Sequence, residues 1–428
     1  MKTWTDLTHY AGFDWAKDHH DIVIVDRSGT KVADFRIPDT AEGWRDFADR
    51  VKKFPVVGAV VETRYGAMIE RLLGAGCAVF PINPKTATRY RERKTSSGAK
   101  SDRLDAWSMA DALRLDGQSW KALEPEDALT QELRQLCRDE VALIEQRTAF
   151  VNQLQQALHE YYPAALEAFD DWTHPAAWAF IERFPTSEVL KSAGKKHWEK
   201  FLHMHRMYRP QTHEKRLACF ARAGDFCGSP GTTAAKSLLA LSIVEMLKPL
   251  QKQLDEYRCR ITKVFERHPD HDVFGSLPGA GGKIGPRLLG EIGTDRERFE
   301  DPQALQCYAG TAPVTQATGK RSKRNASVYM RRACNLNLRQ AVHFLADLSR
   351  RTCTWAQVYY QKKRGEGHRH ASALRCLGQR WMKIVWAMWR ERKKYDPELH
   401  QRNQVAHGSW VVALITDNQA PLAPAPTN

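Results

Sequence analysis

Four carboxylates in the first quarter of the chain have positions that suit phosphoryl-transfer chemistry. Asp14 lies in an apolar run, and Glu62 directly follows the β-branched run VVGAVV at residues 56–61. Asp102 and Asp105 are three residues apart in a segment with helical spacing, so they share one face of that helix. Carboxylates that converge repel one another and need a cation, and such an oxygen-rich set suits Mg²⁺ or Mn²⁺. An ion held there would bind a phosphate oxygen and polarise the attacking or leaving oxygen.

The segments around these carboxylates predict an α/β domain that would position them. Alternating apolar residues in 11–36, interrupted by the turn sequence DRSG, predict a β-hairpin. The run at 56–61 predicts a buried strand, residues 77–81 a short strand, and residues 100–115 a helix. Sites in α/β sheets commonly lie at the carboxyl ends of strands, which would bring Asp14 and Glu62 together. Capping or a surface position accounts equally for each carboxylate taken singly, so the spacing alone leaves both interpretations open.

Positive charge is concentrated towards the C-terminal end of the chain. The sequence has 65 Lys and Arg against 50 Asp and Glu, a formal net charge of +15. Residues 271–400 hold 24 Lys and Arg against 11 Asp and Glu, whereas residues 1–125 are almost balanced at 20 against 18. This excess of positive charge argues against a typical cytosolic metabolic enzyme, because such enzymes are usually acidic. It predicts a polyanionic partner, with nucleic acid preferred over an anionic membrane surface.

Several of these basic residues are candidates for phosphate contacts, because Arg can grip phosphate oxygens in a bidentate way. The predicted nucleic-acid contacts are Lys320, Arg321, Lys323, Arg324, Arg331 and Arg332, followed by the run 361–364. A solvated surface is the alternative interpretation of such a run. Binding to a membrane surface would explain the basic region, but it would not explain the four carboxylates Asp14, Glu62, Asp102 and Asp105.

The middle of the chain predicts two long amphipathic helices, at 128–162 and 234–267. They favour a helical, coiled-coil spacer, with two helices packed on a globular core as the alternative. After residue 268 the composition changes, and the sequence predicts Gly-rich turns and basic helices. The predicted domains are residues 1–125 (catalytic), 126–268 (spacer), 269–400 (C-terminal domain) and 401–428 (a partly disordered tail).

The sequence also predicts the compartment of the protein. The first twenty residues contain no apolar core of signal-peptide length, and no apolar stretch is long enough to cross a membrane. Nine scattered cysteines without a CxxC pair suit reduced thiols rather than disulfides or structural zinc. We therefore expect a cytoplasmic protein that is not attached to a membrane.

Five sequence blocks occur in an order that resembles the DEDD transposases of the IS110/IS1111 insertion-sequence family. They lie at residues 12–26 (GFDWAKDHHDIVIVD), 61–76 (VETRYGAMIERLLGAG), 81–113, 277–293 (LPGAGGKIGPRLLGEIG) and 298–324. The third block contains the family's NP and K-[ST]-D-x-x-D-A elements, as PINPKT and KSDRLDA. The resemblance covers about residues 10–115 and 275–350.

The resemblance implies a RuvC-like, ribonuclease-H-type α/β fold for the first domain and a mainly α-helical C-terminal transposase domain beyond the spacer. It also implies that Asp14, Glu62, Asp102 and Asp105 form a catalytic, metal-binding tetrad for Mg²⁺ or Mn²⁺.

The family's nucleophile is a Ser directly before a Gly, downstream of a Gly-x-x-Pro turn, and this chain has Thr318 at the matching position. Thr has the same hydroxyl and can act as a nucleophile, but its methyl group crowds an in-line attack. Three alternatives follow: Thr318 is the nucleophile, Ser322 or Ser327 has taken over, or the protein is impaired at this step.

The resemblance further implies a transposase, or recombinase, of an insertion sequence. It would cut and rejoin donor and target DNA through a covalent protein–DNA phosphoester. A structured noncoding RNA would guide it, and a homo-oligomer, a dimer or tetramer, is expected in the bacterial cytoplasm at the nucleoid. The tetrad and Thr318 would meet either because the chain folds back or because two protomers each supply one part. Two alternatives are a RuvC-like nuclease or resolvase that uses water, and a decayed transposase that only binds nucleic acid.

Overall fold

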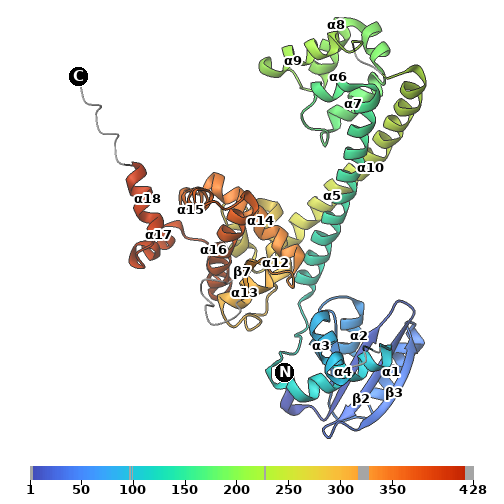
Figure 1. Cartoon of the computed structure of the whole chain (residues 1–428), viewed down its shortest axis with the longest axis vertical. Helices are drawn as coiled ribbons and strands as arrows, with labels where there is room; N and C mark the ends of the chain where they lie inside the picture. The colour runs from blue at the N-terminus through green and yellow to red at the C-terminus, as the bar shows by residue number, and fades with distance from the viewer. Residues whose placement is uncertain (1–2, 96–97, 99, 226–227, 317–326, 420–428) are drawn as a thin grey trace. The chain divides into compact units, whose positions relative to one another are not determined.

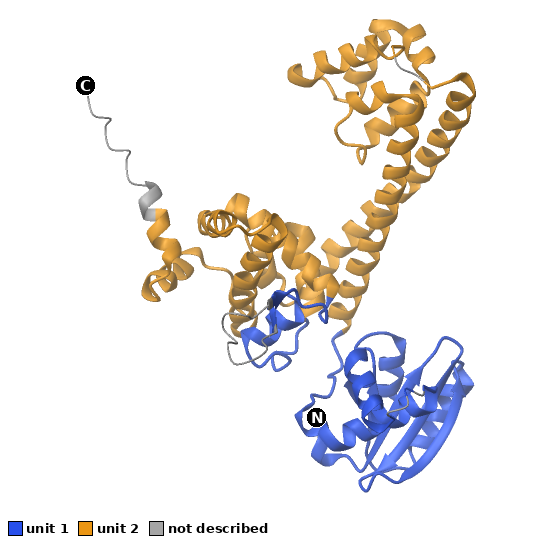
Figure 2. Ribbon diagram, viewed as in Figure 1, with its two compact units in different colours: residues 1–127, 293–335 blue, residues 128–292, 336–428 orange. Residues whose placement is uncertain are grey.

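The computed structural model describes residues 3–95, 98, 100–225, 228–316 and 327–419. Its contacts divide the chain into two compact units (Figure 2). Unit 1 contains residues 1–127 and 293–335, and unit 2 contains residues 128–292 and 336–428. Each unit therefore combines segments from distant parts of the sequence.

A five-stranded mixed sheet forms the centre of the first part of unit 1 (Figure 1). Its strands are β1 (His9–Trp15), β2 (His19–Asp26), β3 (Lys31–Pro38), β4 (Val57–Val61) and β5 (Ala78–Pro81). Their order is β3-β2-β1-β4-β5, with β1–β2 and β2–β3 antiparallel and β1–β4 and β4–β5 parallel. The predicted hairpin is thus a three-stranded meander. Its first turn, at residues 16–18, has the sequence AKD, in which Asp18 is the single residue that favours a turn, so the signal in the sequence is weak.

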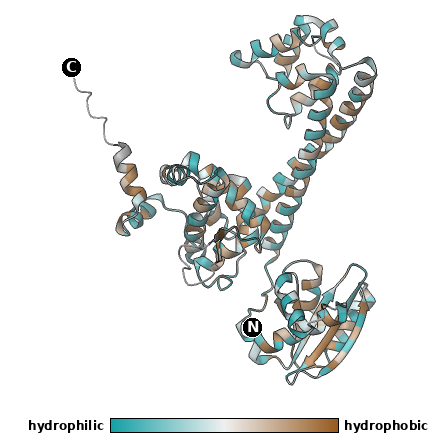
Figure 3. Cartoon of the chain, in the orientation of Figure 1, coloured by the Kyte–Doolittle hydropathy of each residue, from teal (hydrophilic) through white to brown (hydrophobic). Residues whose placement is uncertain are grey.

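Helices cover both faces of this sheet, and its strands are largely hydrophobic (Figure 3). Helices α1 (Ala41–Val51) and α2 (Ala67–Gly74) share a core with Phe13 on one face. Helices α3 (Pro84–Lys94) and α4 (Asp102–Asp116) share a core with Tyr10 on the other face. Two short 3-10 helices, η1 (Trp4–Asp6) and η2 (Gly117–Ser119), complete this part.

Strand β1 and helix α4 approach each other closely at Gly12. A Cβ atom added at Gly12 would lie 1.7 Å from the backbone oxygen of Ala106 in α4. Only glycine permits this approach, and it brings the first turn of α4 to the end of β1.

The second segment of unit 1 contains α13 (Pro302–Tyr308) and the antiparallel strand pair β6 (Val314–Gln316) and β7 (Ser327–Tyr329). Asp301 caps α13 by accepting a 2.7 Å hydrogen bond from the amide of Ala304. Gly310, with φ of 69°, follows the end of α13 and allows the chain to turn towards β6.

Unit 2 is built on two long helices, α5 (Ala128–Tyr161) and α10 (Pro230–Arg267), which pack along each other (Figure 1). The predicted long helices are confirmed, although α10 begins four residues earlier than expected because Ser229 caps it and Pro230 suits its first turn. Helix α10 also continues through Pro249. This residue is exposed, where water can hydrogen-bond the carbonyl that a proline leaves unpaired.

Four helices between α5 and α10 form a lobe around an aromatic core. They are α6 (Pro163–Ala168), α7 (Pro175–Arg183), α8 (Ser187–Met204) and α9 (Pro210–Ala221). Three of them begin at a proline, so residues that look like helix breakers in the sequence act here as helix starts. The buried rings of Phe180 and Phe220 are stacked at the centre of the lobe, 5.0 Å apart.

Helices after α10 form the rest of unit 2. They are α11 (His271–Gly275), α12 (Gly281–Ile292), α14 (Leu336–Thr352), α15 (Thr354–Gly365), α16 (His370–Glu391), α17 (Pro397–Ala406) and α18 (Trp410–Gln419). Trp381 and Trp389 are buried, whereas Trp386 is only partly buried. An α/β domain followed by a mainly helical region confirms the predicted fold class. Among the described residues, none of the helices is both long and apolar enough to cross a membrane.

Candidate functional site

The four predicted carboxylates lie on the α4 side of the sheet in unit 1. Asp14 has the same parity in β1 as Gly12, which faces α4. Glu62 follows β4, two residues beyond the position that pairs with Gly12 in the parallel ladder. Asp102 and Asp105 occupy the first turn of α4. The start of this helix is fixed by the side chain of Ser101, which accepts a 3.3 Å hydrogen bond from the amide of residue 104.

Electrostatics show that these side chains are close enough to repel one another. Burial, followed by the negative charges of Asp105, Asp102 and Glu62, raises the pKa of Asp14 to about 6. Burial, followed by the charge of Asp105, also raises the pKa of Glu62. The four carboxylates therefore lie near one another, and they include Asp14 and Glu62, which the positions at strand ends predicted to be close.

A fifth carboxylate, Asp21, lies beside them. It is directly opposite Asp14 in the β1–β2 register and is only 1% exposed. The guanidinium of Arg36 donates to Asp21 through Nη2 at 2.7 Å and through Nε at 3.1 Å, which compensates the buried charge. Sequence reasoning missed Asp21 because the β1–β2 turn was missed, and that turn sets the register.

Asp102 and Asp105 have different neighbours. Nη1 of Arg91 in α3 donates to both carboxylate oxygens of Asp105, at 2.8 and 3.0 Å. Ligand atoms of His19, Asp21 and Asp102 lie within 4.8 Å of one another, a separation that a metal ion can bridge. The site thus has a second candidate ligand set at its β2 edge.

Asp14 and Glu62 fit a cation best. Both are about half-buried with a raised pKa, and within the described residues neither carboxylate has a hydrogen bond or an ion pair. A half-buried carboxylate without a partner is costly, and a divalent cation with oxygen ligands compensates this cost. The residues present therefore suit Mg²⁺ or Mn²⁺.

The loop after Glu62 is bound to the second segment of unit 1. The Tyr65 and Tyr308 hydroxyls share a short hydrogen bond, and Nη2 of Arg298 donates to Tyr65 Oη at 2.9 Å. The Arg298 guanidinium also lies 4.7 Å from the centre of the Tyr308 ring, and the side-chain Nδ2 of Asn335 donates to Tyr308 Oη at 2.8 Å. We call Tyr65, Arg298, Tyr308 and Asn335 the tyrosine cluster.

Most residues predicted for the nucleophile and the basic run lie outside the described residues. These are Thr318, Lys320, Arg321, Ser322, Lys323 and Arg324. Ser327 is in β7, where it pairs with residue 316 of β6, but its side chain is not described. The strands on either side of residues 317–326, β6 and β7, pair with each other in unit 1.

The remaining predicted basic contacts differ in exposure. Arg332 is exposed and has no ion pair within the described part of the chain, whereas Arg331 is partly buried. In unit 2, the ammonium of Lys362 lies 4.3 Å from the Trp410 ring, and Lys363 pairs with Glu366 at 2.6 Å.

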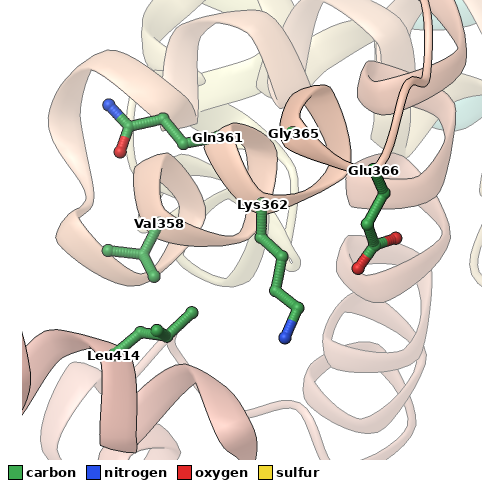
Figure 4. A pocket seen from close by; sticks show the side chains of 6 residues that line it. All are labelled: Val358, Gln361, Lys362, Gly365, Glu366 and Leu414. Carbon is green, nitrogen blue, oxygen red and sulfur yellow. The ribbon is translucent and has the colours of Figure 1, made fainter.

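A hollow of about 410 Å³ lies beside Lys362, between α15 and α18 (Figure 4). Val358, Gly365 and Leu414 line it together with the polar side chains of Gln361, Lys362 and Glu366. Glu366 is the single carboxylate among these described residues, so the hollow lacks the grouped acids of unit 1.

Comparison with known proteins identifies the class. A DEDD-type IS110 transposase model matches residues 11–163, and a model of the IS116/IS110/IS902 transposase family matches residues 271–361. The chain is 31% identical to the mini-circle putative transposase for IS117 of Streptomyces coelicolor, over 92% of this chain and 97% of that protein. It is 25% identical to uncharacterized proteins of insertion elements IS110 of Streptomyces coelicolor and IS900 of Mycobacterium paratuberculosis, over 92% and 91% of this chain and 97% of each relative.

The protein is therefore a transposase, an enzyme that cuts DNA. It belongs to the IS116/IS110/IS902 family, which confirms the resemblance inferred from the sequence blocks. Neither family model matches residues 164–270, which include the lobe of unit 2.

Proposed function

We propose that Asp14, Glu62, Asp102 and Asp105 form the metal-binding tetrad of a DEDD transposase that cuts and rejoins DNA. The observation that carries this proposal is the pair Asp14 and Glu62, half-buried with raised pKa values and no partner within the described residues. Mg²⁺ or Mn²⁺ held there would supply Lewis-acid stabilisation of charge at a scissile phosphate. Arg91 and Arg36 keep the neighbouring carboxylates Asp105 and Asp21 oriented.

The hydroxyl of Thr318 is the proposed nucleophile. Its Oγ1 attacks phosphorus, the bond from phosphorus to a deoxyribose oxygen breaks, and that oxygen takes up a proton as it leaves. A second deoxyribose hydroxyl then attacks the protein–DNA phosphoester, which restores Thr318 and joins the strands. The phosphoester conserves the bond energy, so the exchange needs no nucleotide cofactor.

Contacts within unit 1 support the alternative in which one chain folds back, so that its own tetrad and its own Thr318 meet. The strands that flank residues 317–326 belong to the same compact unit as the tetrad. The tyrosine cluster fastens Tyr308, at the end of α13, to the loop that follows Glu62. We therefore propose that one chain supplies both the tetrad and Thr318 to the same site.

A trapping experiment tests the nucleophile. The full chain is incubated with Mg²⁺ and DNA that carries the ends of the element, and the products are denatured and analysed for DNA bound to protein. We expect an adduct on the peptide that contains Thr318, present in Ser322→Ala and Ser327→Ala and absent in Thr318→Ala. An adduct that persists in Thr318→Ala assigns the role to another hydroxyl. DNA cleavage without any adduct would favour the nuclease that uses water.

The guide is proposed to be a structured noncoding RNA that pairs with donor and target DNA, while the protein contacts backbone phosphates. Family membership and the basic segment 271–400 support this proposal. Lys320, Arg321, Lys323, Arg324, Arg331 and Arg332 are its proposed phosphate contacts in unit 1. Sequencing of RNA that copurifies with the chain, followed by recombination with and without that RNA, tests the proposal. Recombination that proceeds without RNA would contradict it.

A homo-oligomer, a dimer or tetramer, is proposed for the active form in the bacterial cytoplasm. Two DNA partners must be cut and joined together, and paired long helices such as α5 and α10 are common assembly elements. Light scattering of the chain with DNA measures the mass directly, and a monomer that completes strand exchange would contradict it.

A further inference from the structure

The loop between α8 and α9 in the lobe of unit 2 presents basic and aromatic side chains together. Residues 203–209 read HMHRMYR. Tyr208 is 49% exposed and Met204 is 68% exposed, and the side chains of Arg206 and Arg209 are also exposed. Exposed apolar groups that lie close together, unlike scattered ones, can mark a contact surface.

The backbone of this loop is held in place from both sides. The amide of Met207 donates to the carbonyl of Leu202 at 2.8 Å, and Nη1 of Arg216 in α9 donates to the carbonyl of Met207 at 2.9 Å. Arg206 adopts a left-handed conformation with φ of 54°, which is unfavourable for a side chain of this size. The exposed groups are therefore presented by a fixed and locally strained turn.

The two histidines beside Tyr208 do not lie on opposite faces of its ring. The rings of His203 and His213 lie 4.1 and 4.2 Å from the Tyr208 ring, and the interplanar angle with His203 is 21°. Two rings on opposite faces of Tyr208 would be roughly 8 Å apart, whereas His203 and His213 are 6.5 Å apart. The two histidines thus support the tyrosine without enclosing it.

Four exposed cations of α8 and of the loop after it have no ion pair within the described residues. Lys196 and Lys200 are exposed and lie one turn apart on α8, on the face that leads to His203. Within the described residues, no ion pair involves either lysine, nor Arg206 or Arg209.

Other cations of the same lobe are neutralised. Lys215 pairs with Asp170 at 2.9 Å, and Arg222 pairs with Glu167 at 3.4 Å. Residues 187–222 hold nine Lys and Arg against three Glu, so the lobe carries a local positive excess.

From these observations we infer that Lys196, Lys200, His203, Arg206, Tyr208 and Arg209, which we call the α8–α9 surface, bind single-stranded nucleic acid. An unpaired base stacks on the exposed part of the Tyr208 ring, and the cations contact the flanking phosphates. A duplex does not satisfy this surface, because its bases are already stacked on one another. This binding goes beyond the proposed function, because it uses none of the tetrad carboxylates.

Photo-crosslinking of the full chain tests the inference. The probes are a single-stranded RNA with 4-thiouridine and a single-stranded DNA with 4-thiothymidine, so the two arms identify the preferred strand. We expect an adduct on the peptide that contains Tyr208, competed by unlabelled single strand and not by duplex of equal length. Tyr208→Ala should lower the yield about tenfold, and Tyr208→Phe should preserve it.

The charge contribution is tested on the same adduct. Arg206→Gln with Arg209→Gln should reduce the salt dependence of its formation by about one phosphate contact per residue removed. Lys215→Gln with Arg222→Gln is the matched control, because these paired cations should contribute nothing. An adduct missing from this peptide, equal competition by duplex, or an unchanged yield in Tyr208→Ala would overturn the inference. The Tyr208 variants should still form the covalent adduct at Thr318, so failure here is distinct from failure of the proposed catalytic site.

Discussion

The acidic site of unit 1 and the α8–α9 surface of unit 2 carry charge in opposite ways. In the acidic site, Asp14 and Glu62 are half-buried carboxylates with no partner among the described residues. At the α8–α9 surface, exposed cations such as Arg206 are the charges without ion pairs in the described chain. A buried, concentrated set suits a small cation, whereas an exposed, spread set suits a polyanion.

This comparison shows why net charge by region is a weak guide to function. Residues 1–125 carry 20 Lys and Arg against 18 Asp and Glu, and residues 126–270 carry 20 against 20. Both regions are close to neutral, yet each contains a patch of one sign. Charges that the fold leaves uncompensated therefore indicate ligands better than the sum of charges does.

Removing a tetrad carboxylate should have the largest effect. We expect Asp14→Asn to lower strand exchange by about a thousandfold or more, because a metal ligand and its stabilisation of the transition state are lost. DNA binding measured by gel shift should remain. Asp18→Asn is the matched control, because this exposed residue lies just beyond the end of β1. Unchanged exchange in Asp14→Asn would favour the decayed, binding-only protein.

The close approach of β1 to α4 positions the acidic site, and a substitution there should have the second largest effect. Gly12→Ala should destabilise the protein by about 3 kcal/mol, because the new Cβ would overlap the backbone of α4. Urea unfolding measures this loss. Gly74→Ala, at the end of α2 with no atom within 4 Å of the added Cβ, is the control and should be neutral or slightly stabilising. Equal stability of the two variants would mean that the approach at Gly12 is not tight.

The tyrosine cluster should couple the two segments of unit 1 more weakly. Tyr65→Phe and Tyr308→Phe should each cost about 1 kcal/mol in free energy of unfolding, and less than twice that together, since both remove the same hydrogen bond. Strand exchange should fall more than DNA binding in both variants. Strictly additive losses in the double variant would show that the two hydroxyls do not interact.

The raised pKa of Asp14 predicts a modest pH effect on stability without metal. The folded-state pKa of about 6 lies above the ordinary value of 3.8, so the folded protein binds the proton more tightly. Stability should therefore fall as pH rises from about 4 to 7, by about 1 kcal/mol after allowance for partial exposure. Urea unfolding with EDTA measures this, and Asp14→Asn should flatten the profile. A profile that is the same in both proteins would contradict the shift.

Sequence patterns predicted that Asp14 and Glu62 end neighbouring strands and that Asp102 and Asp105 share one helical face. The role of the four residues as a metal-binding tetrad was implied by the family resemblance and stays a prediction. Sequence reasoning missed Asp21 and Arg91, since their positions depend on strand register and helix packing, which local patterns do not determine.

Two further features were not predicted from the sequence. Tyr65 and Tyr308 are 243 residues apart, and no periodicity links residues so distant. The α8–α9 surface lies inside the predicted spacer, residues 126–268, where 20 Lys and Arg nearly balance 19 Asp and Glu. The basic and aromatic residues of 203–209 were nevertheless visible in the sequence.

The position of a bound cation tests the tetrad most directly. Crystals of the full chain soaked in Mn²⁺ and measured at the manganese absorption edge would locate the ion by its anomalous signal. We expect a peak about 2.2 Å from carboxylate oxygens of both Asp14 and Glu62. A peak only at His19, Asp21 and Asp102, or none at either set of ligands, would contradict the proposed metal-binding tetrad.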